Sequence, residues 1–291
     1  MTRLNDLEQV NDKIAALIRG GGGFVVGRNG STELETIFSM AIPERLQRYS
    51  GVFPATAASV TNWRKAYMKS LLNVRICATG WYRPFAEQER TMVVGMAPDA
   101  LQCPLRGLEP YYLPASAASR RWTAALEGKR VAVVSAFART AVAQTTAAEQ
   151  IWGPTGGTLL PSSVTWIPVV TGFPPVLAGA AAWPPGVAAG GWSAAVRHCV
   201  DQIVAAKCDV ALIGCGALGM IIADGCRAEG IGAIVMGGAI QVLFGIKGSR
   251  WESHDVIGKF WNDAWVWPAA DETPAGATAI EGACYWHRVG C

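Results

Sequence analysis

The stretch DVALIGCGALG, residues 209–219, decides the fold. Its apolar run 210–213 predicts a buried strand, and the glycines after it predict a tight turn into a helix. The next segment repeats this plan, with an apolar run over 233–236 followed by a second glycine turn at Gly237 and Gly238. Two successive strand–turn–helix units are typical of a parallel sheet covered by helices.

The same criteria place further elements on both sides of these units. Apolar runs predict strands at 24–27, 74–77, 129–136 and 164–170, and amphipathic spacing predicts helices over 1–19, from Ser31 or Thr32, and over 60–72, 122–127 and 192–206. We therefore expect a single α/β domain over 1–291, Rossmann-like, with a mainly parallel sheet and helices on both faces. A proline- and glycine-rich loop region at about 153–191 and a tryptophan-rich C-terminal wrap over 251–291 complete it.

Composition excludes several classes of protein. A hydrophobic fraction of 51% and a charged fraction of 16% exclude disorder over most of the chain. The net charge of +3 gives no reason to expect a nucleic acid as a partner. The longest uncharged run, 151–196, contains too many prolines for a membrane-spanning helix. The N-terminus lacks the pattern of a signal peptide, so we expect a cytoplasmic protein, in the host cytoplasm if it is viral.

Gly214, Gly216 and Gly219 have the GxGxxG spacing of a dinucleotide-binding turn. An NAD site also needs a carboxylate about 20 residues further on, at the end of the next strand. That strand ends in glycines here, and no acid follows before Glu252. An NAD-linked oxidoreductase is therefore a weaker alternative, and a turn with no ligand is another.

The two glycine turns predict a crevice at the carboxyl edge of the sheet, where open α/β folds bind ligands. Positive charges and a polar amide follow the second turn in the sequence. Close backbone approach combined with positive charge suits a diphosphate, although a solvated basic loop has the same pattern. The predicted ligand-binding residues are Gly214, Gly216, Gly237, Gly238, Gln241, Lys247 and Arg250.

A second candidate group lies at the turn after the first strand, where Arg28, Asn29 and Glu33 precede or open a helix. Glu33 is a candidate metal ligand or general base, or it simply complements the positive end of the helix dipole. The sequence contains neither GxSxG nor HExxH, and its three histidines form no pattern, so common hydrolase arrangements are absent.

Several ordered blocks resemble the GT-D type of glycosyltransferase, which has relatives in large DNA viruses and bacteria. They are VGRNGSTELE (26–35), LEGKRVAVVSAF (126–137), ALIGCGALG (211–219), AIVMGGAIQVLFGIKGSRW (233–251), WNDAWVWP (261–268) and EGACYW (281–286). The resemblance covers most of the chain except about 153–193. It implies transfer of a sugar from a nucleoside-diphosphate donor to a glycan or other hydroxyl acceptor.

The resemblance also implies roles for individual residues. The family's Asp-x-Glu motif, which serves metal and donor binding, falls here on Ser31 and Glu33. One carboxylate and one hydroxyl make a weak site for Mg²⁺ or Mn²⁺, so cationic side chains and helix N-termini are an alternative means of neutralising the diphosphate. Asp263 and Glu281 are further candidate carboxylates. The loss of the first acid leaves a non-catalytic nucleotide- or glycan-binding relative as an alternative.

Overall fold

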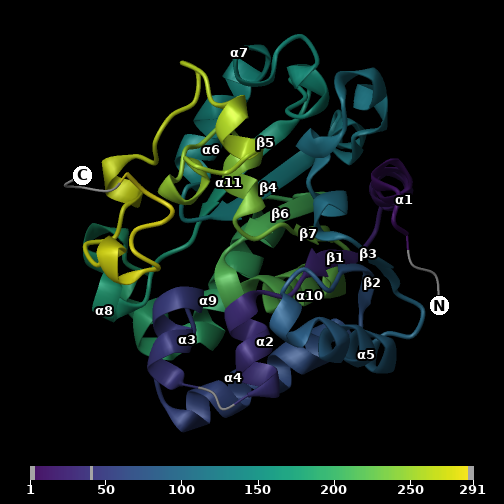
Figure 1. The fold of residues 1–291 in the computed structure, drawn as a ribbon. Helices are drawn as coiled ribbons and strands as arrows, with labels where there is room; N and C mark the ends of the chain where they lie inside the picture. Colours follow the sequence, from purple (N-terminus) through teal and green to yellow (C-terminus); the bar gives the residue numbers. More distant parts are fainter. Residues whose placement is uncertain (1–3, 40–41, 288–291) are drawn as a thin grey trace.

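The computed structural model describes residues 4–39 and 42–287, and these residues form a seven-stranded sheet (Figure 1). The strands are β1 (Val25–Arg28), β2 (Val74–Ala78), β3 (Leu101–Cys103), β4 (Arg130–Ser135), β5 (Thr165–Val170), β6 (Val210–Gly214) and β7 (Gly232–Val235). Their order is β3-β2-β1-β7-β6-β4-β5, and each pair of neighbours is parallel. The predicted fold class is confirmed.

Helices connect and cover these strands. The α-helices are α1 (Leu7–Gly20), α2 (Ser31–Phe38), α3 (Pro43–Ser50), α4 (Ala57–Leu71), α5 (Ala86–Met96), α6 (Ala138–Gln144), α7 (Ala148–Trp152), α8 (Pro175–Ala178), α9 (Pro185–Ala205), α10 (Gly219–Ala228) and α11 (Ala239–Leu243). Short 3-10 turns lie between them, among them η2 (Leu105–Leu108), η3 (Pro110–Tyr112), η5 (Trp122–Leu126) and η10 (Ser249–Trp251). No helix within the described ranges has the length and apolar character needed to cross a membrane.

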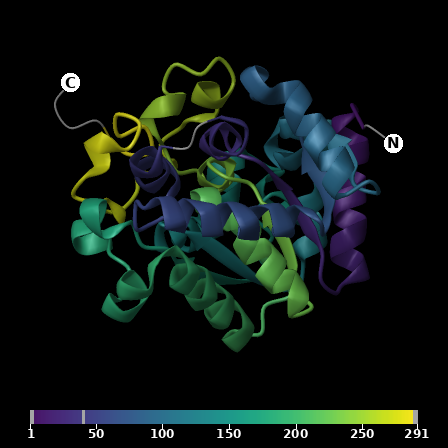
Figure 2. The ribbon, with the colours of Figure 1, turned by 90° about the horizontal axis from the view of Figure 1, so that it is seen from below.

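Alternate side chains of each strand enter two separate cores. In β6, for example, Leu212 packs into one core and Ile213 into the other, as a pleated strand buried on both faces requires. The first core contains α1, α6, α7, α11 and the C-terminal segment, and the second contains α4, α9 and α10. In Figure 2, the green helix α10 lies on the opposite side of the view from the yellow C-terminal segment.

The strand order reverses next to β1. From β1 the chain proceeds outward to β2 and β3, then crosses to β4 and returns through β6 to β7, which pairs with β1. The helix after β1, α2, packs into the second core and the helix after β7, α11, packs into the first, so the chain leaves these two neighbouring strands toward opposite faces of the sheet. Ligands of open α/β folds bind at such a point.

The regions predicted as irregular contain more structure than expected. The loop region holds α8 and the beginning of α9, where Gly191 has a left-handed φ of 71° and lies against the backbone of Phe53. The C-terminal segment wraps over the first core, with hydrogen bonds from the Arg139 N–H to Glu272 (3.0 Å) and from Gln144 to the Ala264 carbonyl (2.9 Å).

Candidate functional site

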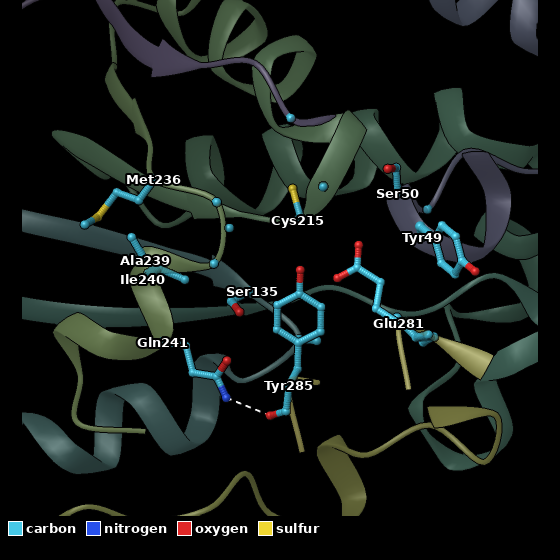
Figure 3. A pocket seen from close by; sticks show the side chains of 18 of the residues that line it. Tyr49, Ser50, Ser135, Cys215, Met236, Ala239, Ile240, Gln241, Glu281 and Tyr285 are labelled. Carbon is cyan, nitrogen blue, oxygen red and sulfur yellow. Dashed lines mark hydrogen bonds between the residues drawn. The ribbon is translucent and has the colours of Figure 1, made fainter. Parts of the chain in front are cut away.

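A cavity of about 300 Å³ lies at the carboxyl edge of the sheet (Figure 3). The cavity is lined by residues that come directly after β1, β2, β4, β5, β6 and β7. The 3-10 turns after β3 and the C-terminal segment form the rest of its wall. Its walls come from distant parts of the chain because all the strands are parallel and end at this edge. Of the predicted residues, the cavity is lined by Arg28, Ser31, Glu33, Gly214, Gly216, Gly237, Gly238, Gln241, Arg250 and Glu281.

The two glycine turns lie against each other, as the sequence predicted. A Cβ atom on Gly214 would stand 2.7 Å from the Gly237 carbonyl oxygen, so a side chain there would push the turns apart. Gly237 has a left-handed φ of 61°, and a Cβ on it would stand 2.6 Å from the Nη1 atom of Arg28. The turns therefore bring the backbone of β6 and β7 close to the Arg28 guanidinium.

Arg28 is the cation of the cavity nearest to these turns. Its guanidinium stacks on Trp81, 4.2 Å from the ring centroid, and its Nε donates a hydrogen bond to the Asn29 carbonyl (3.2 Å). Its charge opposes the rise in the pKa of Glu33, Glu89 and Glu109. Burial is the larger cause in each case, and the guanidinium charge favours the ionised form of all three carboxyl groups.

Glu33 lies in the first turn of α2, with 6% of its surface exposed. Burial raises the pKa of its carboxyl, while Arg28 and its own backbone N–H lower it. A Cβ on Gly30 would stand 2.1 Å from a carboxyl oxygen of Glu33, so the side chain folds back over the residue that caps the helix. Glu33 thus complements the helix N-terminus and also faces the cavity.

Asn29 lies beneath the cavity and does not line it. Its Nδ2 donates to Glu89 (2.9 Å), and its Oδ1 accepts from the Tyr67 hydroxyl (2.8 Å). The Gly80 N–H donates to the other oxygen of Glu89 (2.7 Å). Both ends of the Asn29 amide are therefore engaged in the protein interior, so the structure places Asn29 outside the cavity lining in which a catalytic residue was predicted.

Replacing Asn29 with leucine should destabilise the fold by about 3 kcal/mol, because the Glu89 carboxyl and the Tyr67 hydroxyl lose their buried partner. Urea denaturation monitored by circular dichroism measures this. The matched control is Asn262→Leu, since Asn262 is exposed and its Nδ2 bonds only to backbone carbonyls. Equal midpoints for the two variants would contradict the buried network.

The two predicted phosphate-binding cations occupy different places. Arg250 lines the cavity, and its guanidinium lies over the rings of Tyr285 (4.9 Å) and Trp251 (5.4 Å). Lys247 does not line the cavity, and its Nζ lies 5.8 Å from the ring centroid of Trp261. The backbone N–H of Lys247 bonds to the Val266 carbonyl in the C-terminal segment, so the structure places Lys247 outside the lining of the crevice for which it was predicted.

The two further carboxylates also separate. The Glu281 side chain and the Tyr285 hydroxyl both point into the cavity (Figure 3). Asp263 is exposed and lies outside the lining, so it is not part of this site.

Gln241 fixes the C-terminal segment and offers one free acceptor. Its Nε2 donates to the carbonyls of Lys247 and Tyr285, each at 2.8 Å. Figure 3 shows the bond to Tyr285. These two bonds settle which end of the amide is the oxygen. The Oε1 atom is buried and has no hydrogen-bond partner within the described residues, so it is available to a donor on a ligand.

Sequence analysis missed Glu109 and Tyr111, which line the cavity on the side of β3. Burial raises the pKa of Glu109 to about 7, against the opposing charges of Arg28 and Arg106. Neither residue belongs to a motif. The three-residue strand that leads to them, β3, was too short to be recognised.

Ser31 and Glu33 fit a divalent metal ion poorly. Among the described residues, no group of three or more His, Cys, Asp or Glu side chains could hold an ion. Glu33 is buried beside Arg28, and burial raises its pKa, which disfavours the anionic form that Mg²⁺ and Mn²⁺ prefer. Ser31 supplies only a neutral hydroxyl, so the pair is a poor ligand set for either ion.

No family model matches the sequence, and no curated protein matches it. Two solved structures are similar to it. One is described as the selenomethionine-substituted structure of domain of unknown function 1792, with a TM-score of 0.47, 12% identity and coverage of 81% of this chain and 82% of that chain. The other is described as showing that this highly conserved domain has a distinct glycosyltransferase fold, with a TM-score of 0.46, 12% identity and 82% of each chain covered.

Proposed function

We propose that the protein transfers a sugar from a nucleoside-diphosphate donor to a hydroxyl acceptor. One observation carries the proposal: a single cavity at the strand-order reversal combines paired glycine turns and three arginines with buried carboxyl groups. The glycine turns and arginines suit a diphosphate, and a buried carboxyl group suits the removal of a hydroxyl proton. Glycosyl transfer needs both functions in one place.

The chemistry divides between two parts of the cavity. Arg250 and the backbone at Gly214 and Gly237 bind the diphosphate of the donor. As the bond from the anomeric carbon to the diphosphate oxygen breaks, the electron pair stays on the diphosphate, and the guanidinium stabilises its growing charge. The sugar passes through an oxocarbenium-like state, which the acceptor oxygen attacks while a carboxylate takes its proton.

Arg250 and Lys247 give a matched pair of variants, because they are close in sequence and only Arg250 lines the cavity. We expect Arg250→Met to weaken the binding of nucleoside diphosphates about 10- to 100-fold, the usual loss for a charge-assisted hydrogen bond. Lys247→Met should bind within about twofold of the unchanged protein, since the charge it removes lies over Trp261.

Isothermal titration of both variants with UDP, GDP and CDP tests this, in EDTA and again with Mn²⁺. Equal affinities for the two variants would remove Arg250 from the phosphate site. Binding that requires Mn²⁺ would contradict neutralisation by arginine alone. Diphosphate binding with no turnover of any nucleotide sugar would favour a nucleotide-binding protein over an enzyme.

A further inference from the structure

We propose that Glu109 and Tyr111 form a subsite for the acceptor hydroxyl on the β3 side of the cavity, with Glu109 as the catalytic base. This inference rests on the proposed function and names the residues that hold its second substrate. It assigns the base to a carboxyl group other than Glu33.

Tyr111 lies in η3, and Glu109 is the residue that joins η2 to η3 after β3 at the edge of the sheet. The Glu109 N–H bonds to the Arg106 carbonyl (3.2 Å), and the Glu109 carbonyl accepts from the Tyr112 N–H (3.0 Å). The Tyr111 ring stacks on Trp152, with centroids 5.5 Å apart and planes 10° apart. The backbone and the ring are therefore fixed before a ligand binds.

Each side chain has hydrogen-bonding capacity that the protein does not use. The Tyr111 hydroxyl is buried and has no hydrogen-bond partner within the described residues. The Glu109 carboxyl is 9% exposed, and it forms neither a hydrogen bond nor an ion pair in that part of the chain. Buried polar groups without partners are rare in folded proteins. Here such a hydroxyl lies two residues from a carboxyl group that also forms no hydrogen bond among the described residues, and the pair in the wall of one cavity indicates a ligand that carries hydroxyl groups.

Glu109 is better suited than Glu33 to take up a proton. The Glu33 carboxyl is engaged at the N-terminus of its own helix, whereas the Glu109 carboxyl is uncommitted. The groups that act on Glu109 are Arg28, Arg106 and the phenols of Tyr111 and Tyr112. Burial outweighs both arginines, so its pKa is about 7, near the value at which a general base works best in neutral solution.

In the transfer step, the Glu109 carboxylate takes the proton of the acceptor hydroxyl, and the acceptor oxygen forms the bond to the anomeric carbon. The bond between that carbon and the diphosphate oxygen breaks, and the electron pair leaves with the nucleoside diphosphate. Glu109 then releases its proton to solvent. Tyr111 donates or accepts a hydrogen bond with the acceptor and takes no part in the transfer of the proton.

The first test is turnover of UDP-glucose, GDP-glucose and CDP-glucose with octyl glucoside, octyl galactoside or water as the acceptor. Glu109→Gln should lower the rate about 100- to 10,000-fold, the usual contribution of a general base, and should bind nucleoside diphosphates as the unchanged protein does. The acid limb of its pH–rate profile, near pH 7, should disappear. Wild-type turnover or a retained acid limb in this variant would overturn the inference.

A second measurement is independent of turnover. We expect octyl glucoside or octyl galactoside to raise the melting temperature of the protein in the presence of UDP, and Tyr111→Phe to remove most of that rise. Tyr112→Phe is the matched control, because Tyr112 is the neighbouring phenol and does not line the cavity. The inference fails if neither glycoside stabilises the unchanged protein, or if both variants respond alike. The proposed function fails separately, through absent diphosphate binding.

Discussion

Replacing Arg28 with methionine should lower the rate of sugar transfer about 100- to 1,000-fold, the loss typical when one preorganised electrostatic donor is removed. Arg28 is the one group whose charge opposes the rise in pKa that burial causes in all three carboxyls, Glu33, Glu89 and Glu109. Without it the pKa of each carboxyl rises further, because burial is then less opposed. The acid limb of the pH–rate profile should therefore move to higher pH as well.

Steady-state kinetics over a pH range on both sides of neutrality measure both effects. The control is Arg106→Met, since Arg106 also lowers the pKa of Glu109 but is exposed and does not line the cavity. We expect the control to shift the acid limb slightly and to keep most of the rate. A similar loss of rate in both variants would show that Arg28 acts only through the ionisation of Glu109.

The parts of this fold that the sequence predicts are those specified locally. In β6 the apolar run and the glycine turn are consecutive in the sequence, and a short buried strand needs little else. The same holds for β7 and for the turn at Gly237. Because parallel strands end at one edge of a sheet, these two strands and their turns are enough to predict where the cavity lies.

The composition of the cavity could not be predicted, because it depends on contacts between distant segments. Arg250 and Lys247 are three residues apart, but only Arg250 lines the cavity. Their positions depend on the C-terminal segment, because the Arg250 N–H bonds to the Cys284 carbonyl and the Lys247 N–H to the Val266 carbonyl. Asn29 looked like a neighbour of Glu33, but its partners Tyr67 and Glu89 are 38 and 60 residues away. Spacing in the sequence carries no information about such partners.

A carboxyl group kept in a cavity for chemistry should cost stability, and Glu109→Gln should recover that cost above neutral pH. The pKa of Glu109 in the folded protein, about 7, lies above its ordinary value of 4.5. A raised folded pKa means that the stability associated with this group is fully present below about pH 4.5 and is lost as the pH rises through 7. The difference between these two values corresponds to about 3 kcal/mol of unfolding free energy.

Glutamine keeps the size of the side chain and cannot ionise, so it should stabilise the fold at about pH 8 by up to about 3 kcal/mol and leave it nearly unchanged at about pH 4.5. Urea denaturation at both pH values measures the two differences. Glu127→Gln is the control, since Glu127 is exposed and should respond little at either pH. If Glu109→Gln is no more stable than the unchanged protein at the higher pH, the pKa of Glu109 is not raised in the folded protein. That result would weaken its assignment as the general base. A stabilised variant that no longer transfers sugar would instead show that this one buried group is retained at the expense of stability because the reaction needs it.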